Sequence, residues 1–196
     1  HWRRDDAGAT ADRTAGLALT PTDPFSWVGR AEQRAAADPA AALTDVEAAL
    51  KLDPLLLDGL QMKAHLLTEL KRADEATAVL DRAVHLYPDS APARAGRGVL
   101  LARRGQRDAA LRDAKDALLL DTRAPNLYQV GCIYALTSPA RPDDRREALA
   151  LLWPALKTGY GLDIVDTDTD LDPLRADPEF RRVVAQAREL QRNPRR

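Results

Sequence analysis

The chain has little cysteine, few aromatic residues and no long apolar run, and each shortage excludes a class of protein. Cys132 is the single cysteine among 196 residues, so an internal disulfide cannot form and a cysteine-based metal site would lack partners. Aromatic residues make up 5% of the chain. Alanine and leucine must therefore do most of the packing, which suits closely packed helices better than a β-sandwich. No apolar run approaches the roughly 18 residues of a membrane-spanning helix, so we expect no membrane insertion in this segment.

The charges are balanced and favour no class of polyanion as a partner. Lys and Arg number 29, Asp and Glu number 30, and the formal net charge is −1. Such a balance gives no long-range attraction to nucleic acid or acidic lipid. Arginine alternates with acidic residues along the predicted helices, which is typical of a solvated surface with salt bridges. We therefore expect neither nucleic acid nor an acidic membrane surface as the partner.

A regular period runs through the chain. Pro21, Pro54, Pro88 and Thr122 recur at intervals of about 34 residues, and each closes a segment of the same design. A period of this length is typical of stacked helix-turn-helix units. Small residues that let two helices approach closely recur with it: Ala64, Ala76 and Ala83 in one unit, and Gly98, Ala110 and Ala117 in the next.

This pattern divides the chain into repeats and a C-terminal cap. The incomplete first unit suggests a fragment of a longer protein, and Asp177-Pro178 is a strong signal for the start of a helix. The predicted order is a second helix of a truncated repeat at 1–22, repeats at 23–55, 56–89 and 90–123, a fourth repeat with an extended loop between its helices at 124–160, an acidic irregular linker at 161–176, a capping helix at 177–192 and a frayed tail at 193–196.

The units resemble the tetratricopeptide repeat over residues 5–160. That family has a bulky residue at position 4, small residues at 8, 20 and 27, an apolar residue at 24 and proline at 32. The matching residues are Leu60, Ala64, Ala76, Ala83, Leu80 and Pro88. Arg94 departs from the pattern at position 4 of the third repeat, and the fourth repeat departs in loop length. The resemblance implies an all-α, right-handed α-α superhelix of about 3.5–4 repeats with a C-terminal capping helix. It also implies a non-catalytic scaffold that binds a peptide or protein segment in a concave groove.

A narrower resemblance concerns three stretches of the chain. Residues 93–103, 127–137 and 171–180 are similar to C-terminal repeat regions of large planctomycete-type bacterial proteins, many of which carry an upstream serine/threonine kinase domain. This implies the non-catalytic tail of a larger bacterial protein. A cytoplasmic location is a separate expectation, since a single cysteine is compatible with a reducing compartment. The resemblance leaves open a regulatory or architectural tail that docks on a catalytic domain in cis or only spaces and oligomerises. The chain itself contains no kinase motif.

The family resemblance also assigns the residues that line the groove. Positions 2, 5, 9, 12 and 13 of each first helix face it, and lysine and asparagine at positions 5 and 9, which grip chaperone tails in one subclass, are absent. We expect a shallow groove with apolar anchors at Val99 and Ile133, or else a groove that is empty or filled by the parent protein. The candidate ligand-binding residues are Asp58, Gln61, His65, Glu69, Val99, Arg103, Gln129 and Ile133.

Residues that could carry chemistry are scarce. The histidines form no His-Glu-x-x-His motif, and no nucleophile elbow or phosphate-binding loop is present. Asp166–Asp170 resembles the start of a calcium loop, but Leu171 stands where glycine is needed and Pro173 interrupts the backbone path. Cys132 is assigned to position 8, buried at a helix contact. We therefore predict no catalytic residue, no metal ion, no cofactor and no enzymatic activity.

Overall fold

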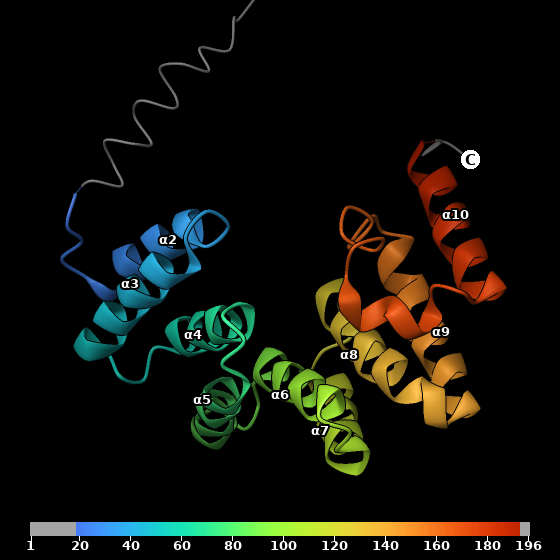
Figure 1. The fold of residues 1–196 in the computed structure, drawn as a ribbon, viewed down its shortest axis with the longest axis horizontal. Coiled ribbons are helices and arrows are strands. Elements are labelled where there is room, and N and C mark those ends of the chain that lie inside the picture. The colour runs from blue at the N-terminus through green and yellow to red at the C-terminus, as the bar shows by residue number, and fades with distance from the viewer. Residues whose placement is uncertain (1–18, 193–196) are drawn as a thin grey trace, which may run out of the picture. The chain divides into compact units, whose positions relative to one another are not determined.

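The computed structural model describes residues 19–192, apart from the side chain of Ala140, and its regular elements there are all helical (Figure 1). The predicted all-α fold of paired helices is thereby confirmed. The helix expected in residues 1–22 and the tail at 193–196 lie mostly or wholly outside the described residues. The helices are α2 (Pro24–Arg34), α3 (Pro39–Leu52), α4 (Leu57–Glu69), α5 (Ala73–Leu86), α6 (Ala91–Arg103), α7 (Arg107–Leu120), α8 (Ala124–Thr137), η1 (Ser138–Ala140), α9 (Pro142–Leu156), η2 (Thr169–Leu174) and α10 (Pro178–Arg192).

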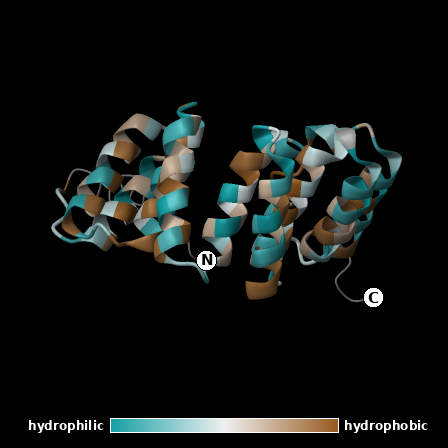
Figure 2. Cartoon of the chain, turned by 90° about the horizontal axis from the view of Figure 1, so that it is seen from below, coloured by the Kyte–Doolittle hydropathy of each residue, from teal (hydrophilic) through white to brown (hydrophobic). Residues whose placement is uncertain are grey.

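The chain forms two compact units, one ending at Val79 and the other beginning at Leu80. In the first unit α2 pairs with α3, and α4 packs against both. In the second, α6 pairs with α7 and α8 with α9, while α8 also contacts α6 and α7. Figure 2 shows the helices carrying hydrophobic and hydrophilic residues on different sides, as expected of helices that bury one face.

Short polar and proline residues begin several of these helices. Asp23 accepts a hydrogen bond from the Ser26 N–H at 2.9 Å, and Asp38 accepts one from Ala41 at 2.9 Å. A proline stands in the first turn after each cap, where its missing N–H costs nothing. The turns between paired helices contain Lys71 (φ 61°) and Gly105 (φ 72°) in the left-handed region, which ends a helix sharply.

Small residues bring the paired helices together, as the period predicts. The alanines at the repeated positions are almost completely buried, and Ala64 is 3% exposed. A Cβ atom on Gly98 of α6 would lie 2.6 Å from Ile133 Cδ1 in α8, so only glycine fits there without a shift of the neighbouring side chain. The alanines at the repeated positions that have no exposed surface are Ala31, Ala42, Ala49, Ala76, Ala83, Ala110, Ala117, Ala148 and Ala155.

Buried aspartates in the second helices hold arginines of the first. Arg30 donates from Nε and Nη2 to Asp45 at 3.0 and 2.7 Å, and Arg97 makes the same two bonds to Asp113 at 2.7 Å each. Asp45 is 2% exposed and Asp113 is 3% exposed. Charged residues were expected on a solvated surface, and these aspartates are an exception that repeats from one unit to another.

The connection in the fourth repeat is shorter than the sequence predicts. The extended loop was expected between residues 137 and 145, but α8 continues to Thr137 and α9 begins at Pro142. Pro139 falls in η1 and Pro142 in the first turn of α9. The two prolines therefore start helices, a position that suits the fixed φ of proline, and do not stiffen a protruding loop.

Residues 161–176, expected as an acidic irregular linker, fold onto the second unit. Turns lead into the 3₁₀ helix η2, which packs against α8. Val165, Leu171 and Leu174 have no exposed surface and belong to the same buried cluster as residues of α8 and α9. The final helix α10 then packs against α9, with Phe180 and Val184 buried.

Candidate functional site

The first helices of the first unit present an accessible and mostly acidic face. On α4, Asp58, His65 and Glu69 are exposed, and Gln61 is half-buried with an Nε2 group that has no hydrogen-bond partner among the described residues. On α2, Glu32 is exposed at the position equivalent to His65, and α2 contacts α4. The face therefore carries three carboxylates around one histidine.

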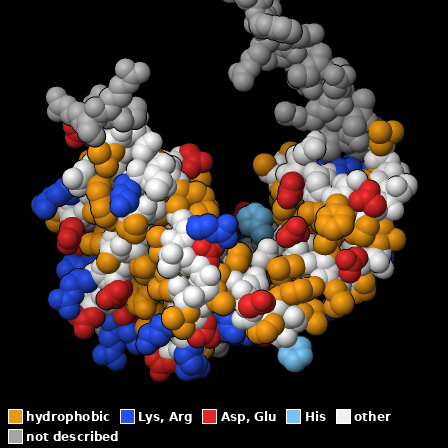
Figure 3. All heavy atoms as spheres, turned by 180° about the vertical axis from the view of Figure 1, so that it is seen from behind, with side chains coloured by type: hydrophobic (Ala, Val, Ile, Leu, Met, Phe, Trp, Pro, Cys, Tyr) orange, Lys and Arg blue, Asp and Glu red, His pale blue; other side chains and the backbone are white. Residues whose placement is uncertain are grey.

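An exposed aromatic side chain stands at the start of the same face. Phe25, in the first turn of α2, is 68% exposed, while Val28 one turn later is buried against Ala49 and Leu56. Elsewhere the surface mixes both signs of charge, as the view in Figure 3 shows. The face thus carries one exposed aromatic side chain in addition to its carboxylates.

The register of α8 differs by one residue from the one predicted. A Cβ on Gly98 would lie 3.3 Å from the Ala110 carbonyl oxygen of the paired helix, and one on Gly131 would lie 2.8 Å from Leu152 Cγ of α9. Gly131 therefore takes position 8, which was predicted for Cys132. Cys132 stands at position 9, equivalent to Val99.

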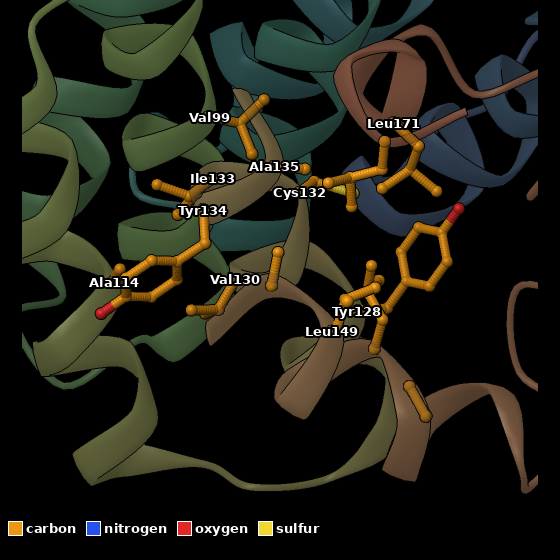
Figure 4. Packing of buried hydrophobic residues seen from close by; sticks show 14 of the residues in the cluster. Val99, Ala114, Tyr128, Val130, Cys132, Ile133, Tyr134, Ala135, Leu149 and Leu171 are labelled. Carbon is orange, nitrogen blue, oxygen red and sulfur yellow. The ribbon is translucent and has the colours of Figure 1, made fainter. Parts of the chain in front are cut away.

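The corrected register changes which residues of α8 line the inner face. Gln129 is half-buried, and Ile133 has no exposed surface because its side chain packs toward Gly98. Figure 4 shows Ile133 and Cys132 pointing in different directions from α8. Ile133 therefore supports the helix packing and does not present the apolar anchor that was expected, and the inner-face residues of α8 are Tyr128 and Cys132.

The chain itself covers this inner face. The Tyr128 hydroxyl donates to Asp168 Oδ2 at 3.0 Å, and the Cys132 thiol lies 3.7 Å from the same oxygen. Arg103 at the end of α6 donates from Nε and Nη2 to both oxygens of Asp170, at 2.7 and 2.9 Å. Leu171 lies beside these groups in the buried cluster (Figure 4). Residues 161–174 thus occupy the inner face of α6 and α8, and we call them the covering segment.

Further hydrogen bonds fix the shape of the covering segment. Asp168 Oδ1 accepts from the Asp170 N–H at 3.0 Å and so caps η2. The Arg175 guanidinium donates to the carbonyl oxygens of Val165 and Asp168 at 3.2 and 2.7 Å. Gly161 (φ 79°) brings the backbone against the Tyr128 ring, where a Cβ atom would collide with it.

The electrostatics of this cluster disfavour nucleophilic or metal chemistry. Burial, with Asp168 close by, raises the pKa of the Cys132 thiol well above its usual value, so the reactive thiolate is suppressed. Burial also raises the pKa of Asp170, although the hydrogen bonds from Arg103 lower it. Ligand atoms of Cys132, Asp168 and Asp170 lie within 4.8 Å of one another. The Arg103 guanidinium, however, already binds both oxygens of Asp170 and neutralises its charge.

Paired antiparallel helices, a repeat of about 34 residues and glycine or alanine at the helix contacts together define the tetratricopeptide repeat fold. No family model matches the chain, and no curated protein matches it in sequence. Among the residues that the structure describes, every helix is too short or too polar to cross a membrane.

Solved structures match the chain over most of its length. It is 25% identical to TTC0263, a thermophilic TPR protein of Thermus thermophilus, with a TM-score of 0.63 and coverage of 94% of both chains. It is 15% identical to MamA, with a TM-score of 0.55 and coverage of 81% of this chain and 96% of MamA. A MamA RS-1 double mutant is 16% identical, with a TM-score of 0.56 and coverage of 88% and 98%. The chain therefore shares the fold of tetratricopeptide repeat proteins, the class of protein interaction scaffolds predicted from its repeats.

Proposed function

We propose that the chain is a non-catalytic scaffold that binds a protein or peptide segment on the inner face of its first helices. The observation that carries the proposal is the covering segment in the second unit. There the inner face already holds a stretch of irregular chain through an arginine–carboxylate pair, a tyrosine hydroxyl and buried leucines. A face built in this way provides both the polar selection and the apolar burial that peptide recognition needs.

The accessible inner face for an external partner is that of α2 and α4. Glu32, Asp58 and Glu69 supply negative charge there, and Phe25 supplies exposed apolar surface. Charge complementarity favours a basic segment, and the phenyl ring favours an apolar residue within it. His65 lies on the same exposed face.

Enzymatic activity and a kinase-linked role have weaker support. Scaffolds of this repeat class are typically non-catalytic, and the raised pKa of the buried Cys132 argues against a nucleophile. The matched structures lend nothing to a kinase-linked context. We therefore keep protein binding as the proposed role.

A charge-reversal experiment tests the proposal. The probe is a short synthetic peptide of lysine, arginine and leucine with a terminal fluorophore, and its anisotropy is followed as the full chain is added. The double variant Glu32→Lys/Glu69→Lys should weaken binding by about tenfold or more, because two carboxylates facing the peptide become cations. Glu75→Lys, the same single change of charge on the second helix α5, is the matched control for Glu69→Lys measured alone.

Two results would count against this role. One is equal weakening by Glu75→Lys, which would mean non-specific attraction to the whole surface. The other is the absence of saturable binding at low ionic strength, where surface electrostatics are strongest.

A further inference from the structure

The covering segment meets the second unit in the way a bound peptide meets a receptor. Its contacts reach side chains from two different repeats: Arg103 of α6, and Tyr128 and Cys132 of α8. Arg103 and Asp170 are 67 residues apart in sequence, so the pair does not shape a local turn. The covering segment also has an open side, with Asp166, Thr167 and Thr169 exposed.

Recognition centres on an aspartate followed by a leucine. Both oxygens of Asp170 are bonded by the planar fork of Arg103, a geometry that selects a carboxylate over other acceptors. The next residue, Leu171, has no exposed surface and lies in the cluster with Val99 and Cys132. A guanidinium that binds the carboxylate and a neighbouring apolar cluster therefore lie side by side on this face.

We propose that the inner face of α6 and α8 is a binding site for acidic segments of the Asp-Leu type, and that residues 161–174 occupy it in cis. The inference rests on the proposed role of the inner faces in holding protein segments. The partner chemistry of this face is opposite to that of α2 and α4. Here an arginine binds an acidic segment, whereas the carboxylates of α2 and α4 bind a basic one.

The covering segment is connected to α9 and α10 by short stretches outside the long helices. It begins at Gly161, which like Gly159 has a positive φ, and ends three residues before Asp177, which caps the start of α10 at Pro178. Its own regular structure is the six residues of η2. Burial of Asp170 on this face disfavours its charged form and raises its pKa, although the hydrogen bonds from Arg103 act in the opposite direction.

Cys132 reports directly on occupancy of this site. It is the single cysteine of the chain, is 2% exposed, and lies beneath Asp168. A thiol reagent can reach it only when the covering segment moves away or the unit unfolds. The rate of Cys132 modification therefore measures opening of the face in the full chain.

The test is restoration of the covering segment in trans. In the full chain, Asp170→Asn/Leu171→Ala should open the face and speed Cys132 modification by about tenfold or more, because the charged hydrogen bonds and the buried leucine are lost together. A synthetic peptide of residues 163–175 should then slow the reaction toward the unsubstituted rate. The control peptide has asparagine in place of both Asp168 and Asp170 and should give no protection.

Arg103→Gln in the same variant should abolish protection by the peptide, since the aspartate carboxylate of the peptide then has no guanidinium to bind it. An unchanged modification rate in Asp170→Asn/Leu171→Ala would overturn the inference, because the proposed contacts would not hold the segment. Faster modification that no concentration of the peptide reverses would overturn it as well. Circular dichroism checks that helicity is kept; if it is lost, Gly161→Ala, which loosens the other end of the covering segment, replaces the double variant.

The result of this test can be distinguished from the result of the experiment with the basic peptide. If the lysine-rich peptide fails to bind while the acidic peptide protects Cys132, binding belongs to α6 and α8 and not to α2 and α4. The reverse result would leave the proposed function standing and remove this inference.

Discussion

Gly131 of α8 lies directly against Leu152 of α9, where a Cβ atom would come within 2.8 Å of Leu152 Cγ. Gly131→Ala should therefore overpack this contact and lower the free energy of unfolding by about 1–3 kcal/mol. Gly29→Ala is the matched control, because Gly29 lies in α2 with open space around its Cα. In that helix alanine should stabilise by about 0.5–1 kcal/mol. Urea unfolding followed by circular dichroism measures both, and equal midpoints for the two variants would contradict the register.

The buried pair of Arg97 and Asp113 should respond more strongly than any exposed pair. Asp113→Ala leaves Arg97 without its bidentate partner, and we expect a loss of about 3 kcal/mol in the free energy of unfolding. Glu75→Ala, which removes the exposed pair with Arg72, should make little difference. The same urea titration compares them. If the two substitutions shift the midpoint equally, the second-helix aspartate has no special role.

The pair of Arg107 and Asp144 should make stability depend on acidity. Hydrogen bonds from Arg107, at 2.7 Å to each carboxylate oxygen, lower the pKa of Asp144 below its usual value. Its stabilising contribution is therefore complete above the unfolded pKa of about 3.9 and is lost as the pH falls through the lower folded pKa. The difference in unfolding free energy between the natural chain and Asp144→Asn should be constant near neutrality and shrink below about pH 4. A difference that grows on acidification would contradict this assignment.

Gly161 should be needed both for its backbone conformation and for its lack of a side chain. Gly161→Ala combines the strain of a positive φ, about 1–2 kcal/mol, with a collision against the Tyr128 ring. Gly105→Ala carries the same type of strain at φ 72° with open space around it. Both should reduce stability, but only Gly161→Ala should speed modification of Cys132. Equal modification rates would mean that the covering segment does not depend on this contact.

The repeat period and the small residues were enough to predict the helix pairs. They succeed because every unit meets the same packing constraint, so alanine or glycine returns at each close approach, as at Ala64 and Ala76. The loop of the fourth repeat was predicted wrongly because its two prolines were interpreted as residues that interrupt helices. At Pro139 and Pro142 proline begins helices, and flanking residues decide between these roles.

The inner face of α8 was harder to predict, because one residue of register exchanges its buried and exposed sides. A signal was present: the pair Ala124-Pro125 follows Ala91-Pro92 at the same interval at which Gly131 follows Gly98. Aligning these pairs assigns Cys132 to the inner face. The covering segment had no comparable signal, since Asp166–Asp170 is non-periodic and its partner Arg103 is distant in sequence.

The packing of α10 on α9 has a consequence for self-association. An uncovered last repeat would offer its apolar side to the first helix of another copy, and such a head-to-tail contact can continue without closing, as in a fibre. Instead α10 buries Phe180 and Val184 there and turns Arg181, Arg182 and Glu189 outward. The surface that α10 presents to other copies of this chain is therefore charged and hydrated, which disfavours polymerisation through this contact.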